Sequence, residues 1–188
     1  MLADMRDEVF DQDRACQALS HDRDRLVEAM DSGVADIDRL TFPDGPLTLL
    51  DLAVHVTMWD EINLGVVTLA LRGRPHWSLD PRWETAEAGG ALNVGGVRAG
   101  RGLTEELIRH RFHAVRQAHI DTIAEIPRSQ WEQELPFAHS GSQPRTLGGL
   151  CHYVNTPEAD PTRKLTYQHA AVHLGATSLS RAAPTGTG

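Results

Sequence analysis

Cysteine and long apolar runs are both scarce in this sequence. Its 188 residues include two cysteines, Cys16 and Cys151, which are too few for a disulfide framework, so we expect free thiols. No apolar run approaches the ~20 residues that span a bilayer. The acidic start MLADMRDEVFDQDR lacks the basic and apolar regions of a signal peptide. These absences predict a cytoplasmic protein with no membrane partner.

Basic charge is scarce as well. The formal net charge is −8, which leaves no cationic surplus to displace counterions from a phosphate backbone. We therefore expect no nucleic-acid partner. The stretch GGVRAGRG lacks the Lys-Ser/Thr pair of a P-loop, and no G-x-S-x-G nucleophile elbow occurs. The sequence thus gives no sign of a P-loop nucleotide site or of an α/β-hydrolase.

What is present is the composition of an ordinary globular protein, with 40% hydrophobic and 23% charged residues. A chain of this length is long enough for one sizeable core. We expect a single domain over 1–181. The tail 182–188 is rich in small residues and is expected to be disordered.

Helical periodicity dominates the sequence, and no segment has the alternation of a strand. Four segments place apolar residues on one face at helical spacing: 7–31, 48–73, 104–126 and 162–180. A further short helix is expected from Thr146 to Val154, and Thr48 with Asp51 resembles a capping box. Helices with one apolar face bury those faces best against each other. We therefore predict an all-α fold, a four-helix bundle with long crossover loops.

The connection 73–102 is the longest between the predicted helices. It contains Trp77, Trp83 and Asn93. A loop of this length inside a compact domain is usually functional or disordered. Two tryptophans argue against disorder, because bulky aromatic side chains need something to pack on. We expect either a short helix within this connection or a lid.

The stretch YQHAAVHLGA places two histidines, His169 and His173, four residues apart on an apolar face. Residues at this spacing lie on one side of a helix with Cβ atoms ~5–6 Å apart, so both imidazoles can reach one metal ion. His55 also lies on an apolar face, between Leu52 and Val56. Bundles build metal sites from facing helices, and three protein ligands are typical of catalytic sites. The three histidines are therefore either metal ligands or core histidines satisfied by their neighbours.

Further residues are expected to line the same cavity because they share the helix faces or the loop that would surround it. Those predicted to contact substrate are Trp59, Trp77, Asn93, Arg98 and His119. Trp59 follows His55 by one helical turn, and His119 lies on the apolar stripe of the third predicted helix. We predict that His55, Trp59 and Asn93 take part in catalysis.

The stretch PLTLLDLAVHVTMWDEINLGVVTLALRGRP resembles the second helix of the DinB/YfiT-like superfamily, which commonly reads D-L-x-x-H-x-x-x-W-(D/E). At these positions stand Asp51, Leu52, His55, Trp59 and Asp60. The segment ALNVGGVRAGRGLTEELIRHRFHAVRQAHIDTIAEIP is similar to the asparagine-containing loop and third helix of one branch. That branch includes mycothiol-dependent maleylpyruvate isomerase-like proteins and ClbS-like (DfsB) proteins. The pair His169 and His173 is similar to the superfamily's ligand pair on the last helix.

This resemblance implies a four-helix bundle, often a homodimer, in which three histidines bind zinc or nickel. It also implies the use of a low-molecular-weight thiol such as mycothiol. We therefore expect a metal-dependent S-transferase or hydrolase that acts on a small electrophilic molecule. His169 stands where we expect a carboxylate in the mycothiol-dependent isomerases, which argues against maleylpyruvate isomerisation itself. ClbS-like members instead protect their producers from reactive natural products without needing a metal, and this alternative stays open.

Overall fold

The structure is a computed structural model that describes residues 11–33, 36–37, 42–138, 146–155 and 167–174. These residues form helices, with two isolated β-bridges and no strand among them. The all-α prediction is therefore confirmed for this part of the chain. The predicted tail 182–188 and the start of the first predicted helix, 7–10, lie outside the described residues.

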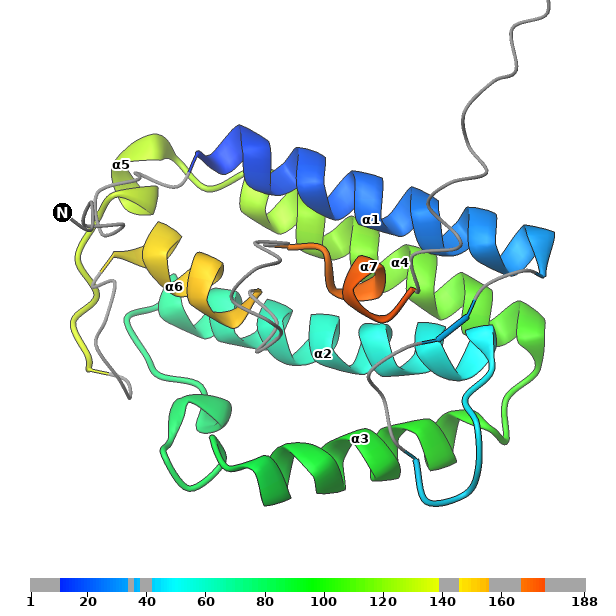
Figure 1. The fold of residues 1–188 in the computed structure, drawn as a ribbon. Coiled ribbons are helices and arrows are strands. Elements are labelled where there is room, and N and C mark those ends of the chain that lie inside the picture. The colour runs from blue at the N-terminus through cyan, green and yellow to red at the C-terminus, as the bar shows by residue number, and fades with distance from the viewer. Residues whose placement is uncertain (1–10, 34–35, 38–41, 139–145, 156–166, 175–188) are drawn as a thin grey trace, which may run out of the picture.

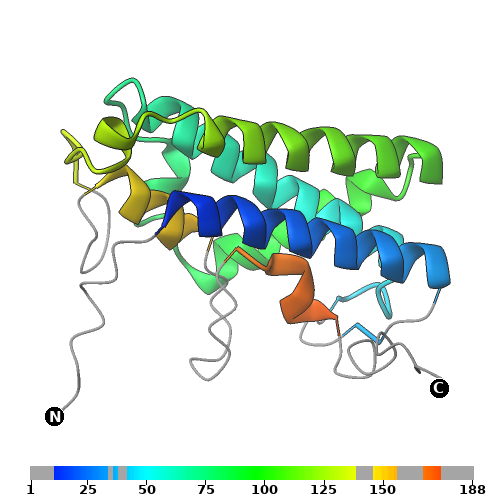
Figure 2. The ribbon, with the colours of Figure 1, turned by 90° about the horizontal axis from the view of Figure 1, so that it is seen from above.

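Three long helices form the body of the protein. They are α1 (Gln12–Ser32), α2 (Leu49–Ala70) and α4 (Glu105–Ala124). Helix α4 packs against both α1 and α2, and Figures 1 and 2 show the three helices running side by side. The capping box predicted at the start of α2 is present, because Asp51 N donates to Thr48 Oγ1 at 3.1 Å and Thr48 N donates to Asp51 Oδ2 at 3.0 Å.

Of the two alternatives predicted for the connection 73–102, a short helix or a lid, the structure shows a helix, because the second half forms α3 (Ala86–Gly100), which is longer than expected. Thr85 caps its start by accepting from Ala88 N at 3.2 Å. Glycine has low helix propensity, so the sequence signal for this helix is weak. Tertiary packing overrides it, because a Cβ on Gly100 would lie 2.5 Å from Val54 on α2. Close contact of the two helices thus requires a glycine there.

Four short elements complete the described part of the fold. They are the 3₁₀ helix η1 (Trp77–Leu79), α5 (Arg128–Trp131), α6 (Leu147–Val154) and α7 (His169–His173). The bounds predicted for α6 are nearly those observed, and Thr146 caps it by accepting from Gly149 N. Figure 1 shows α7 between α1 and α2, and it contacts both.

The last predicted helix, 162–180, is wrong in the part that the structure describes. Tyr167 has a φ of +61°, and Leu174 is extended and forms a β-bridge with Ile37. Only the single turn α7 lies between them, and 162–166 and 175–180 fall outside the described residues. The two histidines of this turn keep their helical spacing nevertheless.

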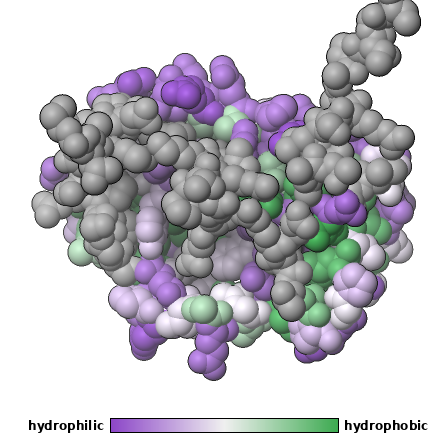
Figure 3. Space-filling view, viewed as in Figure 1, coloured by the Kyte–Doolittle hydropathy of each residue, from purple (hydrophilic) through white to green (hydrophobic). Residues whose placement is uncertain are grey.

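The described surface and core follow the expected division of polarity. Figure 3 shows hydrophilic side chains along the upper and lower edges of the face seen in Figure 1. The core includes Leu26 from α1, Leu52 and Val56 from α2, and Phe112 from α4, each essentially without solvent exposure. Among the described residues, none of the helices combines the length and the apolar character that crossing a bilayer requires.

Candidate metal centre and its cavity

Three histidines from two helices meet in the interior. His55 projects from the second turn of α2, and His169 and His173 begin and end the single turn of α7. Each imidazole offers one nitrogen that lies within 4.8 Å of the corresponding nitrogens of the other two. The shortest pair joins Nε2 of His55 to Nε2 of His169 at 3.0 Å. The predicted convergence of these rings is therefore present.

The donor set fits a divalent transition metal. With metal–nitrogen bonds of about 2.0–2.1 Å, two imidazole nitrogens on one ion stand roughly 2.9–3.4 Å apart at angles of about 90–110°. The 3.0 Å pair has this spacing, and the widest separation in the triad, up to 4.8 Å, must shorten for all three nitrogens to bind one ion. In addition, Nδ1 of His55 is buried without a hydrogen-bond partner. The described residues thus leave one ring nitrogen of His55 without a hydrogen-bond partner.

The surroundings favour the neutral imidazoles that metal ligation requires. Burial, with the charge of nearby His173, lowers the pKa of His55 to about 3. Burial is also the main cause that lowers the pKa of His169 well below its usual value, and the charges of His55, His173 and Arg116 act in the same direction. Protons therefore compete weakly for these nitrogens near neutral pH.

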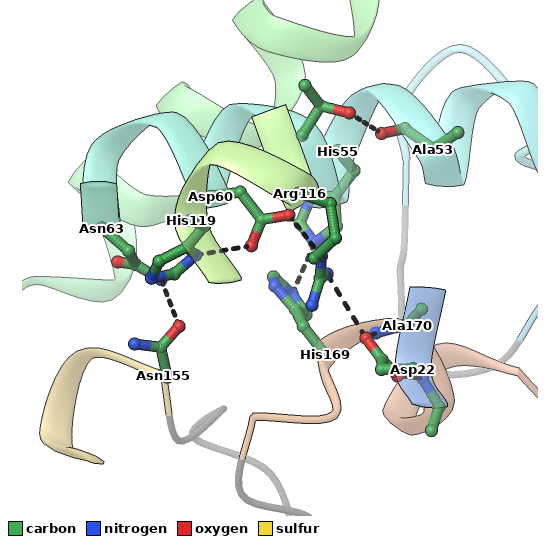
Figure 4. A network of polar contacts seen from close by, with 12 residues as sticks. Asp22, Ala53, His55, Asp60, Asn63, Arg116, His119, Asn155, His169 and Ala170 are labelled. Carbon is green, nitrogen blue, oxygen red and sulfur yellow. Dashed lines mark hydrogen bonds and ion pairs between the residues drawn. The ribbon is translucent and has the colours of Figure 1, made fainter. Parts of the chain in front are cut away.

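A buried ionic network lies directly behind the triad (Figure 4). The guanidinium of Arg116 on α4 stands between two carboxylates, with Nε 2.8 Å from Asp60 Oδ2 and Nη2 3.3 Å from Asp22 Oδ2. Nδ1 of His119 lies 3.6 Å from Asp60 Oδ1. All four side chains are almost fully buried. Two carboxylates against one guanidinium give this network a formal charge of −1, which complements a nearby cation.

The network also fixes the histidine-bearing turn. The carboxylate of Asp22 accepts hydrogen bonds from Ala170 N at 3.0 Å and from Ala171 N at 2.8 Å. Both amides belong to the residues between His169 and His173. Burial raises the pKa of Asp22, while Arg116 and the two amides oppose that rise. Asp22 thus ties α7 to α1 between the two imidazoles.

Tyr167 sets the entry to this turn from the other side. Its φ of +61° is uncommon for a bulky residue, and its backbone N–H donates to the carbonyl of Asn155 at 2.9 Å. Asn155 is held in turn by Asn63 of α2, whose Nδ2 donates to its Oδ1 at 3.3 Å. Asn155, which caps the end of α6, therefore links α6 both to α2 and to the residue that leads into α7.

A cavity of about 710 Å³ opens onto the triad. All three histidines line it, together with the predicted substrate-contacting residues Trp59, Trp77 and Asn93. Nε1 of Trp59 donates to Oδ1 of Asn93 at 2.8 Å, which links α2 to α3 across the cavity wall. Asn93, which the sequence placed in the long connection 73–102, therefore lies on the helix α3 and is held by a protein partner.

Two of the predicted substrate-binding residues do not line this cavity. Arg98 forms a bidentate ion pair with Asp44 at 2.6 and 2.7 Å on the surface. His119 is fully buried behind the cavity and faces Asp60. The helix carrying Arg98 turns this side chain away from the triad, and the burial of His119 assigns it to the ionic network.

Sequence reasoning missed the two residues at the centre of this network. Asp22 lies on the buried stripe of α1 between Leu19 and Leu26, at spacings of three and four residues. Arg116 lies four residues after Phe112 on the buried face of α4. A charged residue at an otherwise apolar helix position is the signal that would have identified both.

The chain matches no family model, no curated protein and no solved structure.

Proposed function

We propose that this chain is a metal-dependent enzyme of the DinB/YfiT-like type with a four-helix bundle fold. Its reaction would be either the transfer of a thiol to a small electrophilic molecule or the hydrolysis of such a molecule. The observation that carries the proposal is the convergence of His55, His169 and His173 within 4.8 Å at the inner end of a cavity. These three imidazoles would hold a zinc or nickel ion. When bound, such an ion lowers the pKa of a thiol or water and draws electrons from a substrate oxygen.

The residues around the triad have separate tasks in this proposal. Asp22 and Arg116 hold the turn that carries two of the ligands. Trp59 and Asn93 close the wall between α2 and α3, which limits the access of water to the reacting groups. In a transfer reaction the thiol gives its proton to solvent water, and the sulfur attacks the electrophilic carbon. A carbon–sulfur bond forms while the leaving group departs with its electron pair.

The thiol must come from a second substrate, because neither cysteine of the chain is activated. Burial raises the pKa of Cys151 to about 12. Burial, together with the charges of Asp13 and Asp121, also raises the pKa of Cys16. Neither cysteine lines the cavity. A nucleophilic cysteine needs a lowered pKa, so a low-molecular-weight thiol such as mycothiol is the proposed nucleophile.

The first test is metal content and thiol conjugation measured on the same protein. The full chain is loaded with zinc or nickel and given 1-chloro-2,4-dinitrobenzene with mycothiol, bacillithiol or glutathione in turn. We expect one metal ion per chain and conjugate formation with one of these thiols. His55→Ala should lose both, whereas His113→Ala, an exposed histidine on α4, should keep both. Equal metal content in His55→Ala and in the unaltered protein would refute the proposal.

A second function is supported by the size of the cavity. A volume of about 710 Å³ is in the range of pockets for drug-sized ligands and exceeds what a small electrophile fills. A ClbS-like protein that binds or opens a reactive natural product, with histidines as acid or base, would use this space. Activity that survives exhaustive chelation would favour this second function over the first.

A further inference from the structure

The wall of the cavity that α3 contributes has two neighbouring positions without a side chain. Gly89 and Gly90 both line the cavity, and a Cβ built on either would meet no atom within 4 Å. Glycine inside a helix reduces stability relative to alanine, by a factor of roughly 2–5 in the folding equilibrium. The protein's own packing gives no reason for glycine at these two positions. Close approach of a ligand to the helix backbone would explain glycine at both positions.

Two tryptophans lie in the wall at the start of this same helix. Trp77 of η1 and Trp83, two residues before the cap of α3, are each 45% exposed. Their ring centroids lie 4.9 Å apart with an interplanar angle of 69°. Both line the cavity with the two glycines. Apolar ring surface left exposed beside a cavity favours a ligand that covers it.

A third observation is an unfilled hydrogen-bond donor at the inner end. Nη1 of Arg116 is buried and has no hydrogen-bond partner among the described residues, and both Arg116 and His169 line the cavity. The other nitrogens of this guanidinium face Asp22 and Asp60. A buried donor of this kind is normally satisfied by an acceptor, and an oxygen of a ligand in the cavity would supply one.

We propose that the cavity binds a substrate with a flat conjugated ring system, seated against the Gly89–Gly90 backbone and the Trp77–Trp83 pair, and with an oxygen acceptor directed to Arg116. The ring system would occupy the space left by the two glycines and would contact the exposed faces of the two indole rings. The proposal deepens the proposed function, because it takes the cavity at the three histidines as the substrate site. It excludes saturated, bulky substrates of equal size.

The test compares glycine variants of the same helix. Gly90→Ala and Gly95→Ala both remove an exposed helical glycine whose Cβ meets nothing, but Gly95 does not line the cavity. Both variants should therefore melt at a higher temperature than the unaltered protein. Binding of the neutral fluorescent probe N-phenyl-1-naphthylamine to the full chain should weaken about tenfold in Gly90→Ala and change less than twofold in Gly95→Ala. Trp83→Leu should weaken it about fivefold.

Displacement of the probe tests the shape and the acceptor. We expect 2-acetylnaphthalene to displace it at about fivefold lower concentration than 2-ethylnaphthalene, and acetyl-decalin, the saturated counterpart, to displace it least. Equal binding to Gly90→Ala and Gly95→Ala, or equal displacement by the flat and saturated ketones, would overturn the proposal. Because the probe needs no metal, the same glycine pattern in His55→Ala would uphold this proposal even if that variant refuted the metal site.

Discussion

The substitution Asp22→Asn tests whether the buried network positions the metal ligands. Asparagine has the shape of aspartate but one acceptor oxygen, and its NH₂ group would face one of the two amides that Asp22 now accepts from at 2.8 and 3.0 Å. A hydrogen bond to a charged group contributes about 1.5–3 kcal/mol. Loss of one such bond and of the charge beside Arg116 should lower the free energy of unfolding by about 2–4 kcal/mol.

The effect on metal binding should exceed the effect of general destabilisation. Groups that orient a metal ligand typically change metal affinity by about 10–100-fold. We expect a loss of this size in Asp22→Asn, measured by competition with a chromophoric chelator under conditions where circular dichroism shows a folded protein. Asp24→Asn is the matched control, because Asp24 lies on the same helix, is exposed and pairs with Arg23 at the surface. Unchanged metal affinity in folded Asp22→Asn would refute the positioning role.

Three further predictions concern stability, reactivity and pH. Gly100→Ala should lower the free energy of unfolding by about 1–3 kcal/mol, because its Cβ would meet Val54 at 2.5 Å, and urea titration against Gly95→Ala measures it. Cys151, whose pKa burial raises to about 12, should resist iodoacetamide at pH 8 in the native protein and react in urea, as read by mass spectrometry. Burial lowers the pKa of His55 to about 3 from its ordinary value of 6.5, so on acidification the unfolded chain binds this proton first. The metal-free protein should therefore lose stability progressively from pH 6.5 towards pH 3, which urea midpoints across this range would show.

The long helices could be predicted because their sequences carry local signals. The capping box of Thr48 and Asp51 and the apolar stripe of α2 are both readable without tertiary context. Helix α3 has no such clarity, because its glycines argue against a helix when the sequence is considered alone. The close packing of Gly100 against Val54 of α2 favours the helix in the folded protein. That contact is invisible before the partner helix is known.

The candidate site divides in the same way. His55, His169 and His173 could be predicted because histidines on apolar faces are unusual and their spacing is local. The positions of Arg98 and His119 could not be predicted, since each depends on a partner far away in the chain, Asp44 and Asp60. For the same reason the sequence did not reveal that the histidine pair lies on a single turn, whose limits are set by contacts with distant residues.

X-ray absorption of the full chain loaded with one equivalent of zinc or nickel tests the central claim most directly. We predict a first shell that contains three imidazole nitrogens at about 2.0–2.1 Å, with the remaining positions filled by water oxygen or by the sulfur of an added thiol. In His55→Ala, any metal that stays bound should lack the three-imidazole signature, whereas His113→Ala should keep it. A shell with fewer than three imidazoles in the unaltered protein, or one that His55→Ala leaves unchanged, would contradict the account.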